Sequence, residues 1–507
     1  MEMQIGQSNH VGKMGPVCLI IPPSSFLLDE RVFMSLGILR VAAVLEQAGI
    51  QVDVLDLSGF RNFEEAVIDY VQTQTVCHFA ITATTPQMPA ALQIVSAIRQ
   101  KNSTAKIILG GPHITLVNAA YKNELKRSLF GRGHVAMSQV EEVFDVLVAG
   151  DGEEAIFLAL SEDSPKLIDV DDRRSAMFLN NDRLNALPLP ARHLIDVPSY
   201  HYTIDGVSAL SLIAQLGCPF ECGFCGGRSS PMLRNIRTRT SQKVVDEMIH
   251  LYHTYGVTGF MLYDDELNVN PKMVELMDLI AETQKNLGVE WRLRGFIKSE
   301  LFSKEQARAM FRAGFRWILT GFEAGAPRIL KNINKKATKE ENTRCVALAH
   351  DVGLKVKALM SIGHPGETRG TVEETREWLL DVRPDDFDIT IITCYPGTPY
   401  FDEAVPHEFL PGIWVYTCKT GDKLYQIDVD HSRVADYYKG DPNGGYSSFV
   451  YTDYLAPDDL VELRNDVERD VRARLGIPFN PSAPSMLYEH SMGQQGFSQN
   501  ILRRSSV

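Results

Sequence analysis

The sequence contains no long hydrophobic run and few cysteines for its length. No stretch approaches the roughly 18 consecutive apolar residues of a membrane-spanning helix, so we expect no membrane span. The first residues, MEMQIGQSNHVGKMGP, lack the charged-then-apolar pattern of a secretory signal, which favours a cytoplasmic location. Eight cysteines in 507 residues do not form a disulfide framework, and a reducing compartment fits that count.

Basic residues are also fewer than acidic residues. Lys and Arg number 51 against 64 Asp and Glu, which gives a net charge of −13. A large contact with nucleic-acid phosphates would need a basic patch, so we expect a small-molecule or peptide substrate rather than a nucleic acid. The hydrophobic content of 44% and charged content of 23% are ordinary for a globular protein. The length suggests about three domains of roughly 150 residues each.

Three of the cysteines are grouped, in the string GCPFECGFCGGR (217–228) with the spacing C-x3-C-x2-C. Cys218, Cys222 and Cys225 can hold three irons of a [4Fe–4S] cluster, and no fourth cysteine follows at a matching spacing. One iron would then keep an open position for a substrate or cosubstrate. The alternative is a structural zinc site, but zinc prefers four closed ligands and only three are local here.

Residues 16–160 alternate between strands and helices, which predicts a doubly wound parallel sheet with helices on both faces. Ile38–Gln47 and Ala90–Arg99 have helical periodicity. The expected strands are Val17–Ile21, Val52–Leu57, His78–Ala83, Lys106–Leu109 and Val146–Val148. Several of these strands end in glycine-rich turns, and ligands bind at that edge of such sheets.

A second alternating region predicts a partial (β/α)6 barrel. Its expected strands are Leu210–Gln215, Gly259–Tyr263, Glu290–Arg294, Trp317–Gly321, Lys355–Ile362 and Asp388–Thr393. We therefore expect an α/β protein with a Rossmann-like domain at 1–160, a linker at 161–205, the barrel at 206–400 and a small C-terminal region at 401–507. The last region loses the alternation, carries many aromatic residues and contains one amphipathic helix, about Pro457–Leu475.

The chain resembles the cobalamin-binding radical S-adenosylmethionine (radical SAM) enzymes, called class B when they methylate. The resemblance covers about residues 16–400, and the order and spacing of the short strings make it specific. Besides the cysteine string, with Phe224 just before its last cysteine, the matching strings are SLGILRVAAVLEQAG (35–49), ITATTPQ (81–87), LGGPHIT (109–115), AGDGEEAI (149–156), YDDELNVN (263–270), GFEAG (321–325), IGHPGET (362–368) and YPGTP (395–399).

The resemblance implies three cofactors: a [4Fe–4S] cluster on Cys218, Cys222 and Cys225, S-adenosyl-L-methionine (SAM) in the barrel, and cobalamin, as methylcobalamin, in the first domain. It also implies an external electron donor such as flavodoxin or ferredoxin. Turns at the sheet edge would contact the corrin or its nucleotide tail, although a plain strand–turn–helix corner is the alternative. These residues are Thr82, Thr84, Thr85, Gly110, Gly111, Pro112, Gly150, Gly152 and Glu153.

One departure from the pattern concerns cobalt. Many cobalamin proteins carry D-x-H-x-x-G, whose His ligates the metal, but the nearest analogue here is Asp53-Val-Leu-Asp56-Leu-Ser-Gly59. Asp56 stands where the His would be, so we expect no His on the lower face of the corrin. His113 follows a strand in a turn, and we expect it to be a hydrogen-bonding corner residue rather than a replacement ligand.

In the barrel the resemblance assigns Glu323 and the acidic run Asp264, Asp265 and Glu266 to SAM. Glu323 would hydrogen-bond SAM, and one of the acidic side chains would take its amino group, unless the run is only a solvated turn. Arg294, with Lys298, would reach the SAM carboxylate, or else lie at the surface. Gly363 and Pro365 belong to a turn suited to the adenine or ribose.

The expected reaction is methylation of an unactivated carbon. A 5′-deoxyadenosyl radical would take a hydrogen atom from the substrate, and methylcobalamin would supply the methyl group. A non-methylating reaction of the same family, such as cyclisation or ring rearrangement, is the alternative. A sensor that binds cobalamin or the cluster without turnover is a third reading, and it is disfavoured because it would not need Glu323 together with a three-cysteine open cluster.

Overall fold

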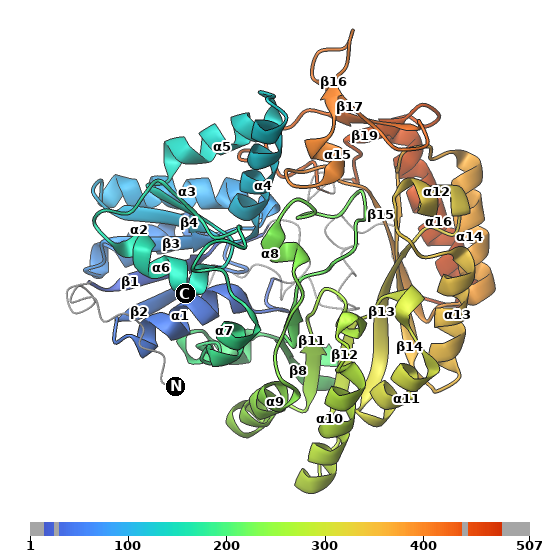
Figure 1. Cartoon of the computed structure of the whole chain (residues 1–507), viewed down its shortest axis with the longest axis horizontal. Coiled ribbons are helices and arrows are strands. Elements are labelled where there is room, and N and C mark those ends of the chain that lie inside the picture. Colours follow the sequence, from blue (N-terminus) through green and yellow to red (C-terminus); the bar gives the residue numbers. More distant parts are fainter. Residues whose placement is uncertain (1–14, 25–29, 439–444, 479–507) are drawn as a thin grey trace.

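A computed structural model describes residues 15–24, 30–438 and 445–478 (Figure 1). Residues 1–14, on which the expected cytoplasmic location partly rests, lie outside these ranges. The first part is a six-stranded parallel sheet. In spatial order its strands are β2 (Val52–Asp56), β1 (Val17–Ile21), β3 (His78–Thr82), β4 (Lys106–Gly110), β5 (Val146–Ala149) and β6 (Leu167–Asp169).

Helices cover both faces of this sheet, as the alternation of strands and helices predicts. On one face α1 (Leu36–Gln47) and α6 (Gly152–Leu160) pack against the strands. On the other face lie α2 (Phe63–Thr73), α3 (Met88–Lys101), α4 (Pro112–Lys126) and α5 (Arg132–Val143). The strands are buried on both sides and therefore consist of nearly continuous apolar residues, such as VCLII in β1.

The second part is a curled sheet of parallel strands that stays open at one edge. Its order is β15 (Asp386–Ile391), β14 (Lys355–Ile362), β13 (Phe315–Glu323), β12 (Arg292–Phe296), β11 (Gly259–Leu262) and β8 (Val207–Leu212), with β7 (Thr203–Ile204) antiparallel beside β8. The covering helices are α9 (Ser241–Tyr255), α10 (Met273–Leu287), α11 (Lys304–Arg312), α12 (Pro327–Asn332), α13 (Lys339–His350) and α14 (Arg369–Val382). This arrangement confirms the expected fold class of a doubly wound sheet followed by a partial (β/α)6 barrel.

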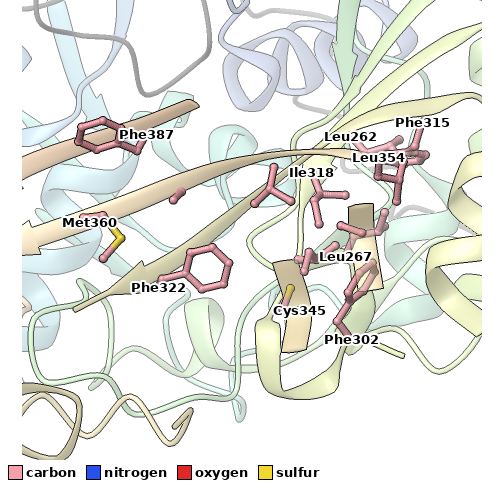
Figure 2. Packing of buried hydrophobic residues seen from close by; sticks show 14 of the residues in the cluster. Leu262, Leu267, Phe302, Phe315, Ile318, Phe322, Cys345, Leu354, Met360 and Phe387 are labelled. Carbon is pink, nitrogen blue, oxygen red and sulfur yellow. The ribbon is translucent and has the colours of Figure 1, made fainter. Parts of the chain in front are cut away.

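The barrel core lies between the strands and their covering helices. Figure 2 shows part of it, in which Phe315, Ile318 and Phe322 of β13 belong to one cluster with Cys345 of α13 and with Leu267. These side chains expose none of their surface to solvent. Burying a side chain of this size contributes about 1.5–3 kcal/mol, so the cluster is a main source of the barrel's stability.

The open edge of the barrel is closed by the C-terminal helix, α16 (Pro457–Leu475). Arg464 Nε donates to the Ile389 carbonyl at 3.0 Å, Glu468 Oε1 accepts from the Ile389 amide at 2.9 Å, and Arg472 donates to the Phe387 carbonyl. These side chains therefore satisfy backbone groups that an edge strand would otherwise leave without a β-sheet partner. The helix has the bounds that its periodicity predicts.

Several expectations about elements need correction. β12 runs two residues later than expected, whereas β8 and β15 run three and two residues earlier, because pairing with neighbouring strands sets their bounds. The expected linker contains β6, α7 (Asn181–Ala186) and β7, so the first sheet continues past residue 160. The C-terminal region forms an antiparallel sheet of β16 (Val405–Pro406), β17 (Ile413–Thr417), β18 (Lys423–Ile427) and β19 (Val450–Thr452), which follows the short helix α15 (Pro399–Asp402).

The first sheet meets the barrel at the segment that follows the cysteine string. Asp151, after β5, pairs through both carboxylate oxygens with Arg237 at 2.7 and 2.8 Å. Asp171, after β6, accepts from Ser230 Oγ at 2.7 Å and from the Met232 amide at 2.8 Å. The side chains of Asp151, Arg237, Asp171 and Ser230 are all buried. The carboxyl edge of the first sheet is thus fixed against the barrel.

Within the described residues, no helix is long and apolar enough to cross a membrane.

Arg237→Gln tests the Asp151 contact. The change leaves the Asp151 carboxylate buried without its cation, and breaking such a pair typically costs about 3–5 kcal/mol. We expect a clear fall in the melting temperature measured by differential scanning fluorimetry. The matched control is Arg174→Gln, because Arg174 is 90% exposed and pairs with Asp172 at the surface. Equal melting temperatures for the two variants would show that the contact contributes little.

Candidate active site

The cysteine loop, residues 217–228, is held by backbone hydrogen bonds to three separate segments. The Cys218 amide donates to Leu233 at 2.9 Å, the Gly223 amide to Ile333 at 2.8 Å, and the Gly227 amide to Gly397 at 2.9 Å. These partners come from α8 (Pro231–Arg234), from the chain after β13, and from the turn after β15. The loop is therefore positioned by hydrogen bonds to the backbone of the barrel.

The three cysteines carry free thiols and influence one another electrostatically. Burial raises the pKa of Cys218 to about 11, and the nearby carboxylates of Glu266 and Asp265 add to the rise. Burial also raises the pKa of Cys222, while Lys335 and Lys298 act in the opposite direction. Thiols with raised pKa values need a bound cation to become thiolates, and an iron–sulfur cluster supplies it.

No three Cys, His, Asp or Glu side chains in the described ranges converge on a single point as ligands of one metal ion. In a [4Fe–4S] cluster each thiolate binds its own iron, so three thiolates leave one iron without a protein ligand. The donor set of Cys218, Cys222 and Cys225 therefore fits a cluster with one iron left open.

Glu323 lies at the carboxyl end of β13, where barrels bind ligands. Its carboxylate accepts from Lys335 Nζ at 3.0 Å and from Ser361 Oγ at 2.9 Å. The residue has φ of +67° and follows a register shift in β13. This left-handed conformation is costly for a non-glycine residue and occurs preferentially at functional sites. Burial disfavours the charge on Lys335, but Glu323, Cys222 and Glu266 outweigh burial and raise its pKa.

A hydrogen-bond relay continues from Glu323 into the C-terminal region. Ser361 Oγ lies 2.8 Å from His364 Nε2, and His364 Nδ1 lies 3.1 Å from the Tyr400 hydroxyl. Burial lowers the pKa of His364 to about 4, so its ring is neutral at physiological pH. Because the Glu323 carboxylate only accepts, Ser361 donates to it, His364 Nε2 donates to Ser361, and Tyr400 donates to His364 Nδ1.

The acidic run after β11 divides into two roles. Asp264 Oδ1 accepts from the Ala214 amide at 2.8 Å and from the Gln215 amide, and Asp265 Oδ2 accepts from the Gly217 amide at 3.1 Å. Both carboxylates thus fix the chain that leads into the cysteine loop. The alternative of a solvated turn is wrong for Asp264, which is buried.

Glu266 is different, because it lies among charges. Burial raises its pKa to about 7, while Lys335 and Lys298 oppose the rise and Asp265 and Glu323 add to it. A cationic ligand group beside Glu266 would favour its ionised form. Of the three acidic residues, Glu266 is therefore the one suited to an ammonium group.

The remaining candidate residues of the barrel, Arg294, Lys298 and Phe224, occupy different positions. Arg294 lies inside β12 rather than after it, is buried, and packs over Trp317 at 5.5 Å, so a surface role is excluded. Lys298 follows β12, and its Nζ donates to the Lys335 carbonyl at 3.1 Å. The ring of Phe224 lies 5.4 Å from that of His364.

The turn after β14 lies next to this site. Gly363 has φ of +87°, and the Pro365 carbonyl accepts from Asn332 Nδ2 at 2.7 Å. Asn332 belongs to α12, so the turn is tied to the helix that follows Glu323.

At the edge of the first sheet the turns after β3 and β4 touch each other. Gly111 has φ of +91°, and a Cβ there would lie 2.5 Å from Thr82 Oγ1. His113 Nδ1 lies 3.1 Å from Thr85 Oγ1, so His113 forms the corner hydrogen bond expected from the sequence.

Two other residues of these turns, Thr84 and Pro112, make local contacts or begin a helix. Thr84 bonds Gln87 through its amide and its hydroxyl, and Pro112 opens α4. A Cβ at Gly110 would meet open space, so its backbone is accessible.

Gly150, Gly152 and Glu153 pack against other residues of this chain. A Cβ at Gly150 would lie 2.6 Å from the Asp171 amide nitrogen, and one at Gly152 would lie 3.2 Å from a Val41 methyl. Glu153 is buried, and burial raises its pKa to about 7. These three residues therefore have a packing explanation, and their contact with the corrin stays a prediction.

Asp56 stands where the cobalt-ligating His would be, and its carboxylate contacts other residues of the protein. The Tyr200 hydroxyl donates to Asp56 Oδ2 at 2.7 Å, and Arg31 lies 3.3 Å from the same oxygen. This residue joins the first sheet to the segment before the barrel.

Four residues of the site, Lys335, Ser361, His364 and Tyr400, were not among the sequence-derived assignments, and Lys298 was only an accompanying candidate. Lys335 lies in the polar string KNINKK, which gives no signal of burial, and Tyr400 follows the YPGTP string. Only their contacts with Glu323 and His364 identify them.

Comparisons with known proteins identify the two domains. The sequence model of the B12 binding domain matches residues 30–141, and that of the radical SAM superfamily matches residues 212–379. The protein is therefore an α/β enzyme with a B12-binding sheet and a radical SAM barrel. It belongs to the cobalamin-binding radical SAM enzymes, whose cofactors are a [4Fe–4S] cluster, SAM and cobalamin.

The chain is 28% identical to an uncharacterized methyltransferase of Pyrococcus horikoshii over 405 residues, 78% of this chain and 85% of that protein. It is 27% identical to the anaerobic magnesium-protoporphyrin IX monomethyl ester cyclase of Cereibacter sphaeroides, over 68% of this chain but only 57% of the cyclase. The radical SAM methyltransferase TsrM of Kitasatospora setae shares the fold, with a TM-score of 0.66, 19% identity and 97% of each chain covered. The cobalamin-dependent enzyme OxsB gives a TM-score of 0.56 at 15% identity, over 78% of this chain and 56% of that one.

Tyr400→Phe tests the hydrogen-bond relay. The change removes the donor to His364 Nδ1 and leaves a buried acceptor unsatisfied, which typically costs about 1–3 kcal/mol. We expect a lower melting temperature than for Tyr416→Phe, the matched control whose ring packs 4.8 Å from Tyr400. If the two variants melt together, the His364–Tyr400 contact does not contribute to stability.

Proposed function

We propose that this protein is a cobalamin-dependent radical SAM methyltransferase that methylates an unactivated carbon of a small molecule or peptide. The observation that supports the proposal is a set of buried hydrogen bonds. Through them Asp151 and Asp171 of the B12-binding domain contact the segment after the cysteine loop. That contact holds the carboxyl edge of the B12-binding sheet beside the cysteine loop. In this family the cluster supplies the electron that converts SAM to a 5′-deoxyadenosyl radical, which takes a substrate hydrogen atom, and methylcobalamin supplies the methyl group.

The barrel residues have distinct parts in this proposal. Cys218, Cys222 and Cys225 would hold a [4Fe–4S] cluster, which would leave one iron free for SAM. Glu266 accepts the SAM amino group, and Glu323, oriented by Lys335 and the relay, hydrogen-bonds SAM. Asp264 and Asp265 position the cysteine loop rather than the ligand.

The B12-binding sheet presents the turns after β3 and β4 to cobalamin. We assign the contact to Thr82, Thr84, Gly110, Gly111 and Pro112, because these residues lie at the carboxyl edge of the sheet. His113 is engaged with Thr85, so we propose that no His binds the lower face of cobalt. Protein groups around the cofactors orient the reactants and exclude water.

Two finer points belong to the same proposal. We place the enzyme in the cytoplasm, because a reducing compartment suits an oxygen-sensitive cluster. The electron would come from an external donor such as flavodoxin or ferredoxin.

A non-methylating cyclisation is the second candidate. It is favoured by the similarity to a magnesium-protoporphyrin IX monomethyl ester cyclase, which extends over 68% of this chain. The two candidates differ in what becomes of SAM. Methylation consumes a second SAM to regenerate methylcobalamin and releases S-adenosylhomocysteine, whereas cyclisation does not.

The test is product analysis after anaerobic reconstitution with about four irons and four sulfides per chain. With SAM, a reductant and hydroxocobalamin, whose reduced form must take its methyl group from SAM, we expect both 5′-deoxyadenosine and S-adenosylhomocysteine by mass spectrometry. Replacing Cys218, Cys222 and Cys225 with Ala should abolish cluster absorbance and both products. Deoxyadenosine without S-adenosylhomocysteine would favour cyclisation, and SAM cleavage by the triple variant would end the radical SAM assignment.

Glu323→Gln tests the SAM contact while keeping the size of the side chain. Removing a charge-assisted hydrogen bond costs about 1.5–3 kcal/mol, so SAM affinity should fall roughly ten- to hundred-fold at unchanged iron content. The matched control is Glu300→Gln, because Glu300 pairs with the buried Lys298 at 3.2 Å as Glu323 pairs with Lys335. Unchanged SAM affinity in a folded, iron-loaded Glu323→Gln variant would remove Glu323 from the site.

A further inference from the structure

A cavity of about 340 Å³ lies between the B12-binding sheet and the C-terminal region. Its walls come from α5, from the start of α4, from α15 and β17, and from residues 428–432. In Figure 1, α4 and α5 approach α15 and the C-terminal strands at the top of the molecule. Its volume is in the range of small-molecule sites.

Arg132, the first residue of α5, is the one buried cation that lines this cavity in the described part of the chain. It exposes 9% of its surface. The guanidinium lies between two aromatic rings, 3.9 Å from the Phe401 centroid and 4.4 Å from that of Trp414. Its Nη2 donates to the Phe401 carbonyl and to Gln426 Oε1, both at 3.0 Å.

No carboxylate oxygen among the described residues lies within ion-pair distance of this guanidinium, and its Nε has no hydrogen-bond partner in the same ranges. Burial lowers the pKa of Arg132, and the more distant Asp428, Asp402 and Glu124 oppose that fall only in part. Glu124 is committed to the amides of Gly131, Gly133 and His134, and Asp402 Oδ1 accepts from the Gly397 amide. Buried charges in proteins are normally paired, because an unpaired one costs several kcal/mol of solvation.

The other walls limit what the partner can be. Phe401, Trp414, Val135 and Val140 offer apolar surface for an organic body. Asp428 and Asp430 also line the cavity and would repel a second negative group. The space therefore suits a ligand with a single anionic group on an apolar frame.

We infer that this cavity binds the substrate through a carboxylate paired with Arg132, so that the substrate is a small organic monocarboxylic acid or zwitterion with an apolar body. The inference rests on the proposed function and adds the substrate class. The cavity adjoins both halves of the expected site. His113 in its wall follows the Gly110–Pro112 turn, and Phe401 follows Tyr400 of the relay.

The test uses a matched pair of probes on the methylcobalamin-loaded protein without SAM. By isothermal titration calorimetry, 3-phenylpropanoate should bind roughly ten- to hundred-fold more tightly than its uncharged amide, the worth of a charge-assisted hydrogen bond. Arg132→Gln should weaken the acid to the level of the amide. Arg127→Gln is the matched control, because Arg127 bonds the Asp402 carbonyl at 2.9 Å without lining the cavity.

Equal affinities for acid and amide, or no binding of the acid by the unchanged protein, would overturn the inference without any need for a variant. Loss of cobalamin from the Arg132→Gln protein would also overturn it, because the anion would then be the phosphate of the cofactor's nucleotide tail. SAM cleavage is measured separately. Failed discrimination with intact cleavage refutes only the substrate class, and discrimination without cleavage refutes the proposed function.

Discussion

The arrangement of the molecule depends on one buried contact, in which carboxylates at the edge of the first sheet bind the segment after the cysteine loop. Asp151 holds Arg237, and Asp171 holds Ser230 and the Met232 amide. Burial raises the pKa of Asp171 to about 6, and its hydrogen bonds oppose that rise. A sheet that binds one cofactor and a barrel that binds two others must face each other at fixed separation. Directed hydrogen bonds fix that separation, which apolar packing alone would leave adjustable.

The second constraint lies within the barrel, where Glu323 adopts a strained backbone. The register shift in β13 and the positive φ of Glu323 accompany the contacts of its carboxylate with Lys335 and Ser361. Such strain persists only when surrounding contacts over-determine it. The relay through His364 to Tyr400 provides those contacts, and the Tyr400 amide in turn donates to Gly223 of the cysteine loop. The Glu323 carboxylate and the cysteine loop are thus positioned by the same residues.

Much of the fold follows from the sequence, because buried parallel strands read as apolar runs between helical segments. β1 and β14 have the expected bounds, while β12 is displaced because pairing with its neighbours, rather than its own residues, sets its register. β6 is not predictable in this way, since three residues carry too little pattern. The cysteines are recognisable from spacing alone. Lys335 and His364 are not, because their burial results from contacts between segments far apart in the sequence.

The C-terminal region makes a second set of contacts with the B12-binding domain. Arg127 donates to the Asp402 carbonyl, and Arg132 to the Phe401 carbonyl and Gln426, so the end of α4 and the start of α5 are bound to α15 and β18. Together with the Asp151 and Asp171 contacts, these bonds fasten the B12-binding sheet at two places. The cavity beside Arg132 lies next to the second fastening, so its walls are held in place. A preformed wall loses little conformational entropy when a ligand binds, which is the condition for placing a substrate accurately between two cofactors.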